Sequence, residues 1–192
     1  MKRAMLLLAG TIAVAGCGGG KTASKPTIPT ASVGDEACAP FDGSTAKQVS
    51  ATKPMQTLLL TAVRIDSEVC ADRIVFDFRP AGGQTPGYAV EYRPATQAQT
   101  EDASGRHIPI AGNAFLVVRF EPAATADLSG AELELTYTGP RTITPVGMRS
   151  VRQVTKTGDF EAVLTWAIGL SEQRPFKVTS SGSPPRLTIE LG

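Results

Sequence analysis

The sequence predicts an all-β protein, a two-sheet antiparallel β-sandwich preceded by a signal peptide and a flexible tether. From about residue 55 onward, apolar side chains recur at every second position, which places them on one face of successive strands. Gly- and Pro-rich turns separate these runs, and no long run has the 3.6-residue repeat of a helix. One apolar face per strand favours antiparallel sheets with one side facing water.

About nine strands are expected from this alternation, in chain order. The apolar sets are Leu59, Val63 and Ile65; Ile74, Phe76 and Phe78; Tyr88, Val90 and Tyr92; Leu116, Val118 and Phe120; Leu133, Leu135 and Tyr137; then the runs 151–154, 160–168 and 176–178; and finally Leu187, Ile189 and Leu191. Trp166 shares its period with Phe160, Ala162, Leu164 and Ile168, so it is expected in the core rather than on a sugar-stacking platform.

The segments between these runs are expected to be turns or loops. Thr157-Gly158-Asp159 separates the strand that begins at Val151 from the run that contains Trp166. Residues 95–112 are polar and broken, and we expect a long loop or a short edge strand there.

The N-terminus has the pattern of an export signal. Lys2 and Arg3 precede an apolar stretch that is too short to span a bilayer, which needs about 20 residues. The run Val14-Ala15-Gly16-Cys17 resembles the lipobox of bacterial lipoprotein precursors, which implies cleavage before Cys17 and a diacylglyceryl thioether on its sulfur. Residues 1–16 are thus the expected signal peptide, and the mature protein is expected on the outer face of the cell membrane, anchored there through Cys17. An ordinary signal peptide with a chance cysteine is the alternative.

Residues 17–54 are expected to form a tether. They are rich in Gly, Pro, Ser and Thr and poor in large apolar side chains, so they cannot bury enough surface to offset the entropy of ordering. The folded domain is then expected at residues 55–192. Without residues 1–16 the chain carries 17 basic and 18 acidic side chains. This near-neutral balance argues against nucleic-acid binding, which requires a basic stripe.

Two further cysteines, Cys38 and Cys70, are expected to form a disulfide because the exported compartment permits oxidation. In the chain-entropy model, closing this loop contributes roughly 3 to 4 kcal/mol. Two buried free thiols are the alternative.

Catalytic chemistry has little support in the sequence. The only histidine, His107, lies in a polar turn, and a zinc site needs at least three ligands. No Ser, Cys or Thr has a base partner except through that same histidine. We therefore expect no catalytic residue, metal or cofactor. A candidate binding rim remains, formed by Tyr137, Arg141, Arg149 and Asp159, whose plainer role is turn solvation.

Several ordered motifs carry a family resemblance across the whole folded part. They are residues 60–64, 72–78, 86–92, 137–140, 157–166 and 174–178, among them Asp72-Arg73-Ile74-Val75-Phe76-Asp77-Phe78 and Tyr137-Thr138-Gly139-Pro140. Together these motifs resemble the AMIN-like domain of actinobacterial lipoproteins and secreted proteins. The resemblance implies a β-sandwich of the kind that cell-wall amidases and secretin-type assemblies use for localisation in the envelope, by contact with peptidoglycan. No catalytic zinc domain follows in this chain.

The resemblance and the lipobox together imply a non-enzymatic, lipid-anchored envelope protein that binds peptidoglycan or a wall-associated protein. The alternative is a carrier lipoprotein that holds a solute or lipid between its sheets, which requires an enclosed apolar cavity. An enzyme would need Asp159, Glu161 or His107 to converge in one cleft.

Overall fold

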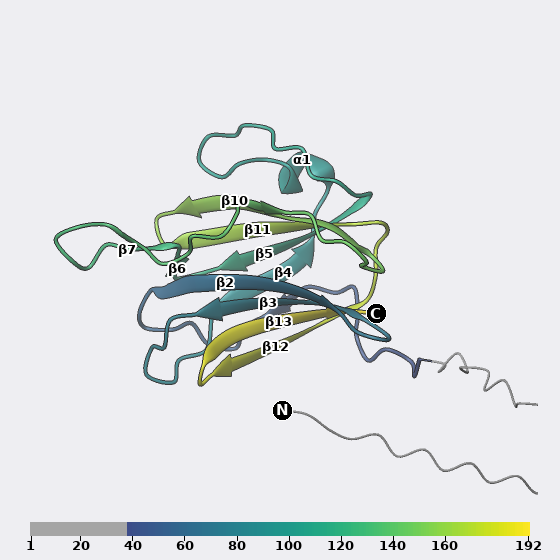
Figure 1. Ribbon diagram of the computed structural model, residues 1–192, viewed down its shortest axis with the longest axis horizontal. Coiled ribbons are helices and arrows are strands. Elements are labelled where there is room, and N and C mark those ends of the chain that lie inside the picture. Colours follow the sequence, from purple (N-terminus) through teal and green to yellow (C-terminus); the bar gives the residue numbers. More distant parts are fainter. Residues whose placement is uncertain (1–37) are drawn as a thin grey trace, which may run out of the picture. The chain divides into compact units, whose positions relative to one another are not determined.

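Two sheets pack face to face, as the alternation predicts (Figure 1). The computed structural model describes residues 38–192; the signal peptide and Cys17 lie outside the described residues. The six-stranded sheet has the order β1 (Gln48–Val49), β4 (Tyr88–Tyr92), β5 (Ala114–Phe120), β11 (Val163–Leu170), β10 (Val151–Phe160) and β9 (Thr142–Ile143). The five-stranded sheet has the order β12 (Phe176–Gly182), β13 (Pro185–Leu191), β3 (Asp72–Phe78), β2 (Leu58–Ser67) and β6 (Ala123–Ala124). Neighbouring strands are antiparallel, except that β6 pairs with β2 in parallel. The all-β sandwich prediction is confirmed.

Aromatic side chains fill the space between the sheets. Phe76 of β3 contacts Phe120 of β5 and Trp166 of β11, with ring centroids 5.1 and 5.8 Å apart, and all three rings are fully buried. Tyr137 packs edge-on against Trp166 at 5.6 Å. The expectation that Trp166 belongs to the core is confirmed.

A buried carboxylate links the two sheets at one end. Asp72, the first residue of β3, accepts hydrogen bonds from the backbone N–H groups of Arg149, Ser150 and Val151 at 3.0, 2.7 and 3.0 Å, and from the Ser150 hydroxyl at 3.0 Å. Burial raises the pKa of Asp72, but these hydrogen bonds together outweigh burial and hold the pKa below its ordinary value of 3.8. The ionised carboxylate therefore fixes the start of β10 against β3.

The hairpin between β10 and β11 differs from the expected strand break. Thr157, Gly158 and Asp159 lie inside β10, and the turn consists of Glu161 and Ala162, with φ of +50° and +58°. Two consecutive residues with positive φ form the tight turn that suits the twist of a hairpin, and Asn or Gly usually occupies these positions. The turn predicted at residues 157–159 was wrong, because Gly158 lies at a β-bulge within β10 and not in a turn.

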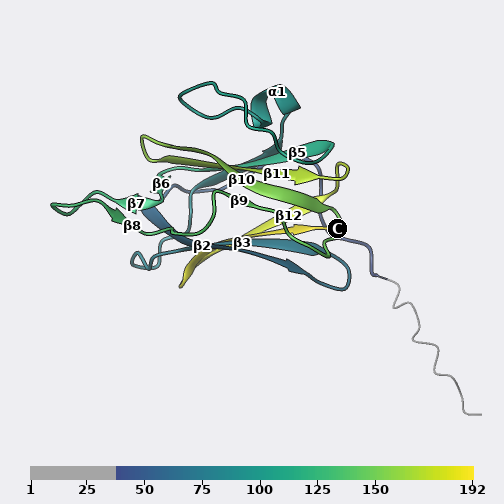
Figure 2. The ribbon, with the colours of Figure 1, turned by 45° about the horizontal axis from the view of Figure 1, so that its top comes forward.

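Residues 126–135 form a projecting arm in place of the strand expected at residues 133–137 (Figure 2). Its two short strands, β7 (Ala126–Asp127) and β8 (Glu134–Leu135), pair only with each other. Leu133 and Leu135 are exposed, so this strand prediction was wrong. Because the arm extends beyond the sandwich, its alternating leucines have no second sheet to pack against.

A β-bulge also changes the face assignment in β2. Leu58 and Leu60 are buried before the bulge, and Val63 and Ile65 pack against the core after it. The extra residue reverses the alternation, so the expected grouping of Leu59 with Val63 and Ile65 was wrong.

Residues 95–112, here called the cap segment, lie on the outer face of the six-stranded sheet (Figure 1). The segment begins with the one-turn helix α1 (Ala95–Ala98). Ala98 and Ile110 pack on Phe115, Val117 and Ala167 of β5 and β11 in a second apolar cluster. This outer face is therefore partly covered, not wholly wet as expected. Among the described residues, no helix is long and apolar enough to cross a membrane.

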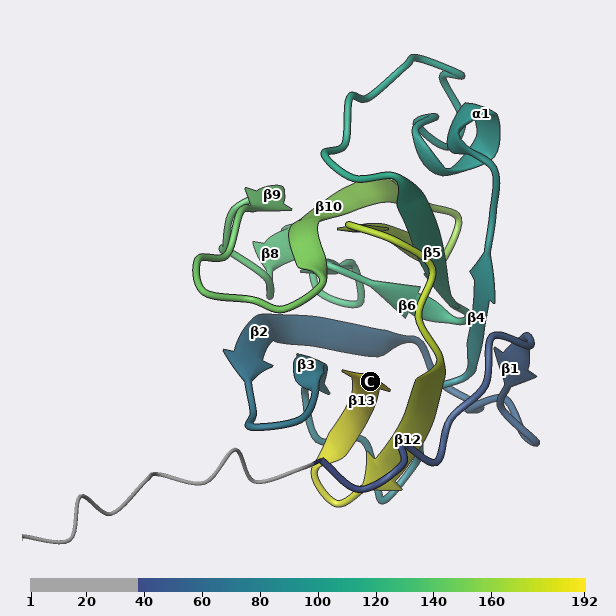
Figure 3. The same cartoon turned by 90° about the vertical axis from the view of Figure 1, so that its right-hand side faces the viewer.

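Residues 44–54, here called the strap, run along the side of the sandwich, where Figure 3 shows β1 beside β4 and β12. The backbone of Ser44 exchanges hydrogen bonds with Phe176 at 3.1 and 2.9 Å. The carboxamide of Gln48 bonds to Phe176 O and Val178 N at 2.9 and 3.0 Å. Residues 44–54 of the predicted tether are thus paired with the domain. Hydrogen bonds of the backbone and of the Gln48 carboxamide hold them there, although they carry no large apolar side chain that could pack into the core.

The predicted disulfide between Cys38 and Cys70 is present, with the Cα atoms 5.5 Å apart. Cys70 lies in the turn between β2 and β3, two residues before Asp72. The C-terminal strand β13 ends at the same place, since Leu191 pairs with Asp72. The described chain therefore begins and ends at one end of the sandwich (Figure 1).

Asp72→Ala should lower the free energy of unfolding by about 3 kcal/mol at neutral pH, because several buried N–H groups lose their acceptor. Since the folded-state pKa is depressed, this contribution is complete above the unfolded pKa near 3.8 and disappears as the pH falls through the folded value. Urea unfolding at pH 7 and pH 3 would measure both effects. Asp66→Ala, which removes only an exposed partner of Arg73, is the control and should cost less than about 1 kcal/mol. Equal losses for the two variants would contradict the role of Asp72.

Gly158→Ala should detach the middle of the cap segment. A Cβ at Gly158 would lie 2.7 Å from Asp102 Cβ, where Asp102 N also donates to Thr157 O at 2.9 Å. Overpacking of this kind costs about 1 to 3 kcal/mol. Amide hydrogen exchange should become faster in the cap segment and remain unchanged in β3 and β13. Gly130→Ala, whose Cβ would meet nothing closer than 3.7 Å, should leave exchange in the cap segment as it is.

Candidate binding groove

A row of small side chains crosses the outer face of the six-stranded sheet near one end. Strand register places Val49 beside Ala89, Ala89 beside Arg119, Arg119 beside Thr165 and Thr165 beside Gly158. The row crosses β1, β4, β5, β11 and β10, and four strand spacings of about 4.8 Å give it a length of about 19 Å. Only Arg119 in this row has a long side chain, so the row forms a shallow floor.

Three adjoining hollows lie along this floor, with volumes of about 390, 510 and 470 Å³. The first and second share Arg119 and Glu121 as lining residues. The second and third share Asp102, Ala103 and Phe160. We call these three adjoining hollows together the outer groove. It runs from the strap, past the β10–β11 hairpin and the cap segment, to Arg141.

Phe160 supplies an exposed aromatic ring in the middle of the groove. It pairs with Val163 across the hairpin, and both line the groove, whereas the next pair, Asp159 and Leu164, lies on the opposite face. The Phe160 residue is 56% exposed, which is unusual for a large apolar side chain in a strand. An exposed ring in a groove offers a flat apolar surface on which a ligand can stack.

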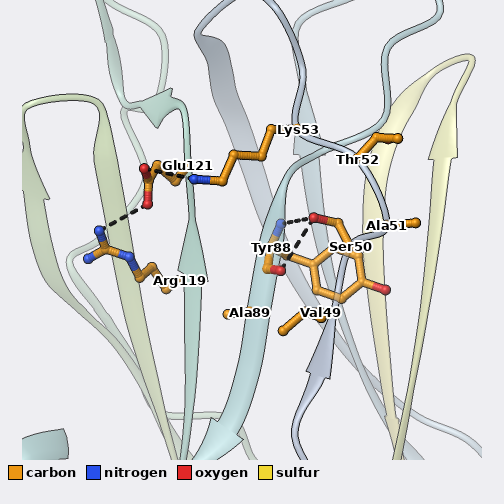
Figure 4. Close-up of a pocket in the computed structure, with 9 residues that line it drawn as sticks. All are labelled: Val49, Ser50, Ala51, Thr52, Lys53, Tyr88, Ala89, Arg119 and Glu121. Carbon is orange, nitrogen blue, oxygen red and sulfur yellow. Dashed lines mark hydrogen bonds and ion pairs between the residues drawn. The ribbon is translucent and has the colours of Figure 1, made fainter.

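At the strap end, three charged side chains form a chain of ion pairs (Figure 4). Lys53 Nζ lies 3.0 Å from Glu121 Oε1, and Arg119 Nη2 lies 3.0 Å from Glu121 Oε2. Hydrogen bonds from Lys53 and then Arg119 hold the pKa of Glu121 below its ordinary value. Exposed pairs of this kind add little stability, so their main effect is to orient the two cations.

At the other end, Glu101 organises a second charged cluster. Its carboxylate accepts from Arg106 Nε and Nη2 at 3.0 Å each and from Arg141 Nη2 at 2.5 Å. Hydrogen bonds from Arg106, Ser104 and Arg141 hold the pKa of Glu101 well below its ordinary value. The cap segment is thus tied to Arg141, which also donates through Nε to Lys156 O at 3.0 Å.

The four residues of the sequence-predicted rim do not gather in one place. Arg141 and Asp159 both line the third hollow, at the edge of β10, where the Asp159 side chain, which shares the inner face of the strand with Leu164, contacts Lys156 Nζ at 3.2 Å and accepts from the Thr125 hydroxyl. Tyr137 is buried, and its hydroxyl donates to Pro140 O at 2.9 Å. Arg149 lies at the opposite end, where its guanidinium donates to Val69 O. The structure therefore brings together only Arg141 and Asp159.

The sequence reasoning missed Lys53, Arg119, Glu121 and Phe160. Arg119 and Glu121 alternate with the apolar set Leu116, Val118 and Phe120 and so resemble the wet side of any strand, and Lys53 lies in the predicted tether. Phe160 was placed with the core residues because the turn at Glu161-Ala162 carries no glycine. The signal that could have identified Phe160 is the alternation itself: once Leu164 and Trp166 face inward, a hairpin partner of Val163 must face outward.

Of the three residues that an enzyme would need, Asp159 and Glu161 line neighbouring hollows of the groove, and His107 lines none of the three. His107 is exposed in the cap segment, opposite Thr100. Among the described residues, no three His, Cys, Asp or Glu side chains gather in an arrangement that could hold a metal ion. The chemistry that the groove offers is therefore stacking, hydrogen bonding and charge.

Comparison with known proteins agrees with this architecture. No curated protein and no solved structure matches the chain significantly. A family model described as the AMIN-like domain matches residues 58–192, which covers well over half of the chain and all of the sandwich from β2 onward. The strap precedes the matched region. The resemblance seen in the sequence motifs is thus confirmed, and the chain belongs to the AMIN-like domain family.

Proposed function

We propose that this protein is a lipid-anchored envelope protein that binds peptidoglycan through the outer groove and carries out no catalysis. AMIN-like domains occur in extracytoplasmic envelope proteins as binding and localisation modules. The observation that carries the proposal is the exposed Phe160 ring in the middle of a groove lined by charged side chains, on the open face of such a domain.

The shape of the groove suits a polymer. The row of residues beneath the groove is about 19 Å long and crosses five strands. Thr165 is buried and Gly158 lies under Asp102 of the cap segment, so the groove passes over these side chains. An extended chain of five or six residues, at about 3.4 Å each, would fill it, and a longer polymer could continue beyond its ends. Ring stacking on Phe160 and hydrogen bonds to the flanking charged groups are the contacts that sugars and short peptides accept.

The position of the groove suits an anchored protein. Asp72 and the Cys38–Cys70 disulfide mark the end of the sandwich at which β10 begins, and Phe160 marks the end of this strand. Ten residues at about 3.3 Å place the two ends about 30 Å apart. A chain anchored at Cys17 would enter the domain at Cys38, at the end opposite Phe160, so its attachment would leave the groove free for a ligand.

Carriage of a ligand between the sheets is less well supported. Phe76, Phe120 and Trp166 contact one another across the interface between the sheets, and each is fully buried. These contacts fill the space that a solute would need, whereas the groove is open.

Phe160→Ala should weaken retention on purified peptidoglycan about tenfold, equivalent to about 1.4 kcal/mol, because the stacking surface is lost. Co-sedimentation of the full-length protein with peptidoglycan over a range of protein concentrations would give the apparent Kd. Leu133→Ala is the matched control, since Leu133 is equally exposed, at 61%, but lies on the arm. Loss of the same size in both variants, or no sedimentation of the unchanged protein at low salt, would refute binding by the groove.

Cys17→Ser should move the protein from the membrane fraction to the extracytoplasmic fluid or the medium, because the serine cannot form the thioether. Metabolic labelling with a fatty-acid probe should mark the unchanged protein and leave the variant unmarked. Cys38→Ser, which keeps Cys17, should remain labelled. An unlabelled wild-type protein would refute the anchor.

A further inference from the structure

We propose that the strap end of the outer groove is a carboxylate subsite, in which Lys53 and Arg119 bind a carboxylate that a polymer ligand carries next to an apolar group. This inference deepens the proposed function, because it names the chemistry that one part of the groove recognises. It depends on residues of the strap, which precede the matched family region.

The charge of this hollow favours an anion. Among its nine described lining residues, only Lys53, Arg119 and Glu121 are charged, so one unit of positive charge remains after the ion pairs form. An ammonium group has three N–H donors and a guanidinium has five, and each cation gives only one short contact to Glu121. Their side chains are 66% and 41% exposed. Both therefore retain donors for a carboxylate from solution.

The strap holds Lys53 in place before any ligand arrives. Ser50 N donates to Tyr88 O at 3.0 Å. Tyr88 N donates to Ser50 Oγ at 3.0 Å (Figure 4). Val49 continues this pairing with Ala89. The carboxylate of Glu121, between the two cations, sets their separation. Such preorganisation lowers the entropy that binding would otherwise cost.

The remaining lining residues offer an apolar surface beside the two cations. Val49, Ala51 and Ala89 are small apolar side chains, Ser50 and Thr52 are small polar ones, and Tyr88 adds an aromatic ring. An apolar group next to the carboxylate gains from burial against this surface, at roughly 25 cal/mol per Å². The ligand class is therefore a carboxylate with an apolar neighbour, and an alanine at the end of a short peptide is the smallest such unit.

The test titrates acetyl-Ala-Ala with a free carboxylate into the full-length protein, in parallel with the same peptide as its carboxamide. Backbone amide shifts of Ala89, Arg119 and Lys53 report binding by NMR. We expect saturable shifts with the carboxylate, weaker binding at high salt, and at least tenfold weaker binding of the carboxamide. Equal affinity for the two peptides would overturn the subsite.

Two substitutions should change carboxylate affinity in opposite directions. Lys53→Met should weaken it at least fivefold, and Glu121→Gln should strengthen it, because an anion that competes with the ligand is removed. If the triad served only to hold the strap, both variants would weaken binding, which would contradict the proposal. Lys177→Met, whose partner Asp42 lies outside the groove, is the control and should leave affinity unchanged.

The outcome is separable from that of the proposed function. Loss of peptide binding in Lys53→Met with peptidoglycan retention still dependent on Phe160 supports both assignments. If the carboxylate and carboxamide peptides bind equally well while retention on peptidoglycan depends on Phe160, the subsite is refuted and binding by the groove is supported. Peptide binding that requires the carboxylate, without retention on peptidoglycan, supports the subsite and refutes peptidoglycan as the polymer.

Discussion

The contact of Phe76 with Phe120 and Trp166 across the two sheets is the constraint on which the groove depends. Successive side chains of a strand point to opposite faces, so the burial of Phe120 and Trp166 directs Arg119 and Thr165 to the outer face. The core and the groove floor are therefore two sides of the same two strands. A change that shifted the register of β5 or β11 by one residue would exchange the two faces.

A buried carboxylate and a disulfide distinguish one end of the sandwich from the other. The Asp72 carboxylate holds the start of β10 against β3, and the Cys38–Cys70 disulfide attaches the N-terminal segment at this same end. The β10–β11 hairpin, with Phe160, lies at the opposite end. The disulfide and the buried carboxylate thus lie where the described chain enters the domain, and the exposed Phe160 ring lies at the other end.

The groove charges are already paired within the protein. Glu121 bridges Lys53 and Arg119, and Glu101 bridges Arg106 and Arg141. Paired charges at an exposed surface add little affinity by themselves but select ligands whose charges match the pattern. Modest contacts repeated along a polymer suit a module that localises a protein, since avidity from many weak contacts can replace one tight site.

The sequence by itself determined the sandwich class, the core position of Trp166 and the disulfide partners, because two-residue periodicity and an even cysteine pair are local or countable signals. It also carried the family motifs. Only the tertiary structure decided that Phe160 faces outward, that Gly158 lies at a bulge against Asp102, and that the strap completes the groove. These features depend on a turn without glycine, on bulges that reverse the alternation, and on a segment held by backbone and Gln48 hydrogen bonds. The contacts of the strap and of Gly158 join residues far apart in the chain, and no local pattern of side chains records them; the orientation of Phe160 follows from the alternation only once the turn is placed at Glu161-Ala162.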